Sequence, residues 1–132
     1  AATSKELKKG IEKHLKETKE HVSRLEKVFE SVGEKAQAKK CDAMDGILKE
    51  GKSIVEDTEK DTMTRDAGII LACQKVEHYE IATYGTLRVF AKHMGHTEAE
   101  QLLSQTLENE KETDVALTKI AEGFVNEQAS EE

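Results

Sequence analysis

Apolar residues recur along the chain at the spacing of an α-helix, in four separate runs. The first run comprises Leu7, Ile11, Leu15, Val22, Leu25 and Phe29. At about 100° per residue these side chains share one face, and Gly33 follows as a helix-ending residue. The second run is interrupted by Gly46 and Gly51, so its helix is the least regular of the four. The predicted helices cover residues 4–32, 37–58, 63–94 and 97–126.

Composition agrees with an all-α chain. The sequence has 132 residues with no proline and an aromatic fraction of only 4%, and Glu, Lys, Ala and Leu dominate it. This length corresponds to one domain with one core, spanning residues 1–132. Helices of these lengths joined by short turns pack as antiparallel neighbours. We therefore expect a helical bundle of three long helices and one shorter helix.

Charge and hydropathy exclude several classes of partner. The net charge is -7, and no face rich in Lys and Arg but free of acids is found, so we expect no nucleic-acid binding. No apolar run approaches the roughly 18 residues that span a bilayer, and the N-terminus lacks the apolar region of a signal peptide. We expect no membrane association and an intracellular location.

Two acids interrupt the apolar stripes of the long helices. Glu80 and Glu110 lie thirty residues apart in matching surroundings, each in the middle of its stripe. The stripe around Glu80 contains Cys73, Val76, Tyr84, Leu87, Ala91 and Met94, and that around Glu110 contains Leu103, Thr106, Asp114, Leu117, Ala121 and Phe124. An isolated ionised carboxylate inside a protein costs several kcal/mol, so it takes up a proton, pairs with a cation or binds a metal.

Further polar residues share these faces. Glu77 precedes Glu80 by three residues and Asp114 follows Glu110 by one turn, so four carboxylates are expected to converge. Oxygen ligands of this kind suit iron or manganese, and bridging carboxylates hold metal pairs in helical bundles. Glu17 and His21, one turn apart at the margin of the first stripe, are expected to join from a third helix.

Other interpretations stay open beside the metal site. The acids could share a proton or pair with a histidine, or they could be partly exposed at a subunit interface. His21 could be a hydrogen-bonded structural residue, and His14 is interpreted as a half-buried core histidine. Tyr84 could donate a hydrogen bond to a ligating carboxylate, although packing alone is favoured. Cys41 and Cys73 form no CxxC pair and are interpreted as reduced, buried thiols.

Five segments of the sequence are distinctive. They are Lys-Glu-Thr-Lys-Glu-His-Val at 16–22, Arg-Leu-Glu-Lys-Val-Phe-Glu at 24–30, Val-Glu-His-Tyr-Glu-Ile at 76–81, Tyr-Gly-Thr-Leu-Arg at 84–88 and Leu-Thr-Lys-Ile-Ala-Glu at 117–122. Together they resemble the YciE/YciF family of bacterial ferritin-like stress proteins. The resemblance covers nearly the whole chain and is most specific between residues 76 and 88.

The resemblance implies a rubrerythrin-like, ferritin-like bundle with a carboxylate-rich di-iron centre. It also implies a cytoplasmic, commonly dimeric protein linked to stress responses, without an assigned substrate. The residues that match the family's metal ligands are Glu17, His21, Glu77, Glu80, Glu110 and Asp114.

The chain departs from the family pattern in two respects. The family usually begins with a further helix bearing a Tyr-Asp-Ala-Glu stretch, which this sequence lacks, so either the chain is shortened or a partner subunit supplies that helix. The Glu-x-x-His pair of ordinary ferritin-like sites is also absent. Its place is taken by Glu-x-x-Glu, Glu-x-x-x-Asp and Glu-x-x-x-His spacings, which leave the identity and number of the metal ions open.

Two hypotheses of function follow. In the first, two iron ions, with manganese as an alternative, are bound by the six residues and react with dioxygen or peroxide. In the second, the bundle binds no metal and acts as a structural or interaction protein through oligomerisation, with its buried carboxyl groups protonated or paired with His21.

Overall fold

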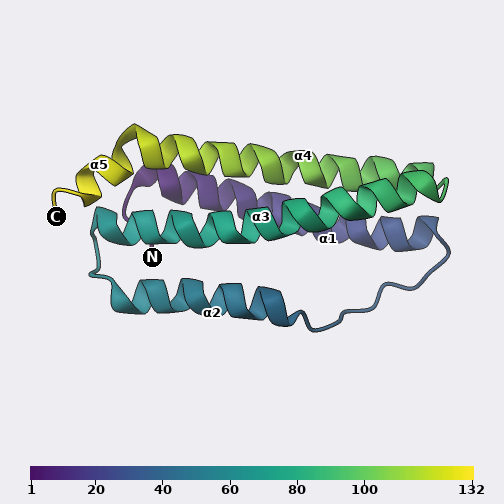
Figure 1. The fold of residues 1–132 in the computed structure, drawn as a ribbon, viewed down its shortest axis with the longest axis horizontal. Coiled ribbons are helices and arrows are strands. Elements are labelled where there is room, and N and C mark those ends of the chain that lie inside the picture. The colour runs from purple at the N-terminus through teal and green to yellow at the C-terminus, as the bar shows by residue number, and fades with distance from the viewer.

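The computed structural model describes residues 1–132 and contains helices without any β-strand. Figure 1 shows that the axes of α1, α2, α3 and α4 are nearly parallel and that these helices run alternately in opposite directions. Their bounds, with the short terminal elements, are α1 (Lys5–Ser31), α2 (Asp42–Asp57), α3 (Met63–His93), α4 (Thr97–Ile120), the π-helix η1 (Ala121–Val125) and α5 (Asn126–Ala129). The expected all-α antiparallel bundle is confirmed.

The predicted helix over 37–58 begins too early, because α2 starts only at Asp42 with Cys41 as its N-cap. The segment 34–40 has no apolar side chain larger than alanine, so it has nothing with which to dock on a neighbouring helix. The predicted helix over 97–126 ends too early. It continues through the wider turn of η1 into α5, which ends at Ala129.

The packing is unequal among the helices. α3 lies against α4, α4 lies against α1, and α2 packs on the outer side of α3 (Figure 1). Gly68 permits the close approach of α2 and α3, because a Cβ atom there would lie 2.5 Å from Cγ2 of Ile54. The buried polar residues of the bundle come mainly from α1, α3 and α4.

The core consists of two apolar clusters with a polar layer between them along the helices. The first cluster contains Leu7, Ile69, Ile70, Leu117, Ala121 and Val125. The second contains Tyr84, Ala91, Ala99, Leu103 and Leu107. The buried polar residues whose sequence positions fall between these clusters are His21, Glu77, Glu110 and Thr113, and the buried Thr106 lies next to Leu107 of the second cluster.

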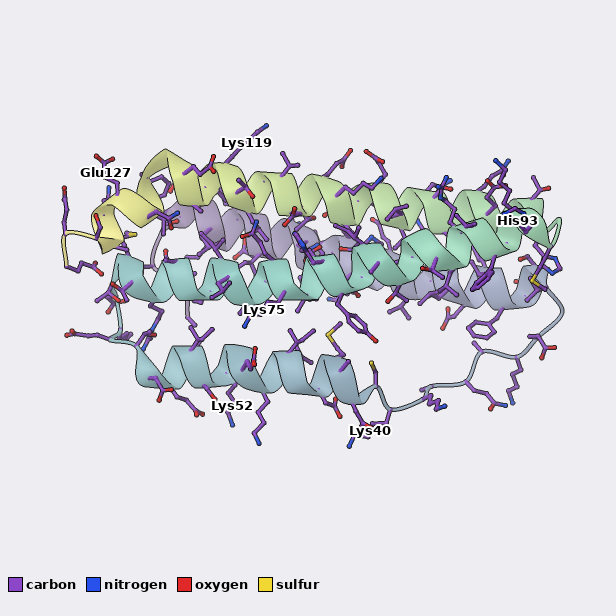
Figure 2. All side chains as sticks on the ribbon, in the orientation of Figure 1. Lys40, Lys52, Lys75, His93, Lys119 and Glu127 are labelled. Atoms are coloured by element: carbon purple, nitrogen blue, oxygen red, sulfur yellow. The ribbon has the colours of Figure 1, made fainter.

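The outer faces of the bundle are charged. In Figure 2, Lys52 and Lys119 extend away from the bundle, and His93 lies at the turn between α3 and α4. None of the helices combines the length and apolar character needed to cross a lipid bilayer.

Candidate metal centre

Three helices bring four potential ligands together. His14 comes from α1, Glu77 and Glu80 from α3, and Glu110 from α4, and one ligand atom of each lies within 4.8 Å of the others. The i, i+3 spacing places Glu77 and Glu80 on one face of α3. Of the four carboxylates expected to converge, the structure brings Glu77, Glu80 and Glu110 together.

His14 faces the cluster through one ring nitrogen and α4 through the other. Its Nε2 lies 3.0 Å from Oε1 of Glu77, while its Nδ1 lies 3.2 Å from the hydroxyl of Thr113. Sequence reasoning interpreted His14 as a core residue and omitted it from the ligand set. Its spacing was the available signal, because seven residues are close to two helical turns and place His14 on the same face as His21.

His21 makes the corresponding contact with the other fully buried acid. Its Nδ1 lies 2.8 Å from Oε1 of Glu110, and its side chain is 3% exposed while that of Glu110 is 0% exposed. The opposite nitrogen, Nε2, lies 3.3 Å from Oδ1 of Asn109. The rings of His14 and His21 stand edge to face with centroids 6.4 Å apart, so α1 presents two histidine–carboxylate pairs side by side.

Glu17 lies at the margin of the cluster, as its position in the sequence suggested. Its Oε1 pairs with Nζ of Lys13 at 3.1 Å, and its Oε2 lies 3.9 Å from Nδ1 of His14. The Oε2 atom is buried without a hydrogen-bond partner. Glu17 can therefore turn toward a cation near His14, but it is not part of the compact group.

The expectation that Asp114 joins the cluster does not hold. Its Oδ1 lies 3.1 Å from Nε2 of His78 and 3.1 Å from Nε2 of Gln74, on an outer edge between α3 and α4. The side chain of His78 is 69% exposed, so this pair faces solvent. The buried positions of α4 beyond Glu110 are Thr113 and Leu117, so Asp114 lies at the edge of the buried face.

The cluster contains buried polar atoms without hydrogen-bond partners. They include Oε2 of Glu77, both carboxylate oxygens of Glu110 and Nδ1 of His21. Nδ1 of His21 and Oε1 of Glu110 lie 2.8 Å apart, and neither atom has a hydrogen-bond partner. Buried polar groups are normally satisfied, and oxygen and imidazole nitrogen atoms are the donors that divalent transition metals accept. These residues therefore fit a cation.

Burial and mutual repulsion perturb the acids. Loss of solvent and the negative charge of Glu110 raise the pKa of Glu80 to about 7. Burial likewise raises the pKa of Glu110, with His21 opposing that effect, and the hydrogen bond with Glu77 raises the pKa of His14. Burial and the negative charges of Glu80 and Glu110 raise the pKa of the nearby Tyr84 to about 12. Protons and metal ions would therefore compete for Glu80 near neutral pH.

The chain is similar to known proteins over nearly its whole length. Residues 1–130 match a family model described as "Domain of unknown function (DUF892)". The chain belongs to this family. It is 44% identical over 130 residues to protein YciF of Escherichia coli strain K12, a match that covers 98% of this chain and 78% of YciF.

Two solved structures are similar over most of the chain. The crystal structure of the E. coli stress protein YciF aligns with a TM-score of 0.89 and 44% identity, covering 95% of this chain and 79% of that one. YcfI from Rhodopseudomonas palustris aligns with a TM-score of 0.85 and 37% identity, covering 89% and 74%. The resemblance of the sequence to YciF-type proteins is thereby confirmed.

Proposed function

We propose that this chain binds two divalent transition metal ions, iron first and manganese as the alternative, between α1, α3 and α4. The observation that carries the proposal is that Glu77 and Glu110 are almost fully buried and retain carboxylate oxygens without hydrogen-bond partners. A buried carboxylate oxygen without a hydrogen-bond partner is costly, and a metal ion bound to that oxygen removes the cost.

The residues proposed to hold the metals are His14, Glu77, Glu80 and Glu110, with His21 and Glu17 at the two sides of this group. The site contains two histidine–carboxylate pairs, His14–Glu77 and His21–Glu110, with Glu80 as a further carboxylate. This donor set is consistent with two metal ions. Asp114 is left out of the proposed set because it faces His78.

The chemistry of the centre would follow from its surroundings. When bound, iron supplies the electrons for a reaction with dioxygen or peroxide. The carboxylates would offset the positive charge, and the apolar clusters on either side would limit the access of water. YciF is described as a stress protein. A role in a stress response, with a cytoplasmic location, is proposed for this chain by analogy.

Anaerobic titration with Fe(II) tests the proposal. We expect binding of about two ions per chain and a higher melting midpoint, since a ligand that binds only the folded state adds to the free energy of unfolding. The double variant Glu77→Gln/Glu110→Gln should lose both effects. Glu108→Gln, on the exposed face of α4, is the matched control and should behave as the wild type. Absence of Fe(II) and Mn(II) binding by the folded wild-type protein would refute the proposal.

A second candidate is a metal-free bundle that works as a homo-oligomer, a dimer in the simplest case. Two grooves with mainly apolar walls favour it. Ile11, Ile47, Val55 and Ile69 are among the residues that line the first, and Leu25, Phe29, Leu87 and Phe90 are among those that line the second. YcfI, described as a candidate structural protein, is consistent with such a role. Sedimentation of the metal-free protein would test it, because a monomer at every concentration contradicts an oligomeric function.

A further inference from the structure

A pair of polar residues outside the cluster reaches the far side of the His21 ring. Oδ1 of Asn109 lies 3.3 Å from Nε2 of His21, and the same oxygen lies 2.7 Å from Nη1 of Arg24. Arg24 also approaches the hydroxyl of Thr106 at 3.5 Å and the carboxylate of Glu20 at 3.5 Å. Asn109 and Arg24 thus form a short hydrogen-bonded chain from the protein surface to the ring.

The chemistry of these groups determines which atom donates. A guanidinium group can only donate hydrogen bonds, so the atom of Asn109 that faces Arg24 must be the amide oxygen. That oxygen can only accept. Nε2 of His21 must therefore carry a hydrogen in order to bond to it.

The consequence appears at the other ring nitrogen. In a neutral imidazole with hydrogen on Nε2, Nδ1 carries a lone pair. Nδ1 of His21 is buried without a hydrogen-bond partner and lies 2.8 Å from Oε1 of Glu110, which is equally without one. Two adjacent, buried lone-pair atoms are suitable ligand atoms for one cation.

We propose that Asn109, held in place by Arg24, is a positioning residue for His21. It accepts a hydrogen bond from Nε2 of His21 and thereby keeps the hydrogen on that nitrogen. Nδ1 is then left to bind the same metal ion as Glu110. This inference rests on the proposed metal centre. A metal-binding histidine usually donates its second N–H to a neighbouring acceptor, which sets its tautomer and ring orientation.

The neighbouring histidine has a comparable arrangement with the ring reversed. His14 places Nδ1 against the hydroxyl of Thr113 at 3.2 Å and directs Nε2 toward Glu77 at 3.0 Å. Asn109 and Thr113 are one turn apart, so a single helix, α4, supplies the outer partner of both histidines. The two rings therefore present opposite nitrogens to the cluster.

Nitrogen-15 NMR of the metal-free protein at pH 8 tests the tautomer directly. We expect His21 to carry its hydrogen on Nε2 and none on Nδ1. Asn109→Leu should abolish this preference while leaving the helical content unchanged. Asn109→Asp, which keeps an oxygen acceptor, should restore it, and Asn126→Leu on α5 is the control for the same substitution at an exposed site. A wild-type His21 with hydrogen on Nδ1, or on both nitrogens, would overturn the inference.

Binding of Zn(II), used as a diamagnetic probe, tests the consequence for the metal. We expect the Nδ1 resonance of His21 to shift on binding, and Asn109→Leu to weaken the affinity about 10- to 100-fold. Asn109→Asp should bind at near the wild-type affinity. If Zn(II) binds but leaves the Nδ1 resonance unchanged, the inference fails while the metal centre stands. If the wild type binds neither Zn(II), Fe(II) nor Mn(II), the metal centre fails, and the tautomer is still decided by the metal-free spectra.

Discussion

Replacing Glu80 by glutamine should stabilise the metal-free protein at alkaline pH. Burial and the charge of Glu110 raise the pKa of Glu80 from 4.5 to about 7. Glutamine has nearly the same shape as the protonated acid but cannot ionise. The substitution therefore removes a charge that the folded protein accommodates poorly.

The direction of the effect depends on pH in a defined way. Because the pKa of Glu80 is higher in the folded than in the unfolded chain, its favourable contribution is complete below pH 4.5 and is lost as the pH rises through about 7. A rise from 4.5 to about 7 corresponds to about 3 kcal/mol. Glu80 is only partly buried, so solvent screening reduces this to about 1 to 2 kcal/mol at pH 8.

Thermal unfolding of metal-free wild type and Glu80→Gln at pH 4.5 and pH 8 provides the measurement. For a domain of this size, about 1 to 2 kcal/mol corresponds to a melting midpoint about 4 to 8 °C higher for the variant at pH 8. The two midpoints should nearly coincide at pH 4.5. Glu108→Gln, an exposed acid, is the control and should have little effect. A variant less stable than the wild type at pH 8 would refute the reasoning, because it would mean that the ionised Glu80 is paired in the folded state.

Two further predictions concern packing and thiol reactivity. Gly68→Ala should destabilise the protein by about 1 to 3 kcal/mol, because the added Cβ would lie 2.5 Å from Ile54. Gly85→Ala, on the same helix with no atom within 4 Å of the added Cβ, should instead stabilise it by about 0.5 to 1 kcal/mol, as denaturant unfolding would establish. Iodoacetamide should alkylate Cys41 before Cys73 at pH 8, because hydrogen bonds lower the pKa of Cys41 while burial raises that of Cys73. Mass spectrometry of the labelled peptides that finds the reverse order would contradict this.

The helices were predictable because their signals are local. Apolar residues at helical spacing, together with the glycines that follow at positions 33 and 95, predict the bounds of α1 and α3 to within a residue or two. Both glycines adopt a positive φ angle, which favours glycine at the end of a helix. The start of α2 was less predictable, because segment 34–40 has ordinary helix formers and lacks only a surface against which to pack.

The composition of the cluster was only partly predictable, because it depends on how α1, α3 and α4 are rotated against one another. The sequence match between the stripes around Glu80 and Glu110 suggested that Asp114 faces inward. In the fold, the buried face of α4 instead passes through Thr113, so Asp114 lies on its edge. His14 belongs to the cluster because the orientation of α1 against α3 directs its ring toward Glu77. A single sequence contains the helical period but not this rotation.

The polar layer between the two apolar clusters lets one substitution distinguish the two candidate functions. In a metal-free structural bundle, buried acids without partners weaken the fold, and neutral replacements of similar size are neutral or stabilising under all conditions. In a metal-binding bundle, the same acids weaken only the metal-free state. When a cation is present they bind it, and this binding to the folded state raises the free energy of unfolding. The substitution Glu80→Gln should thus change sign between metal-free and metal-loaded protein if the centre binds metal, and should keep its sign if it does not.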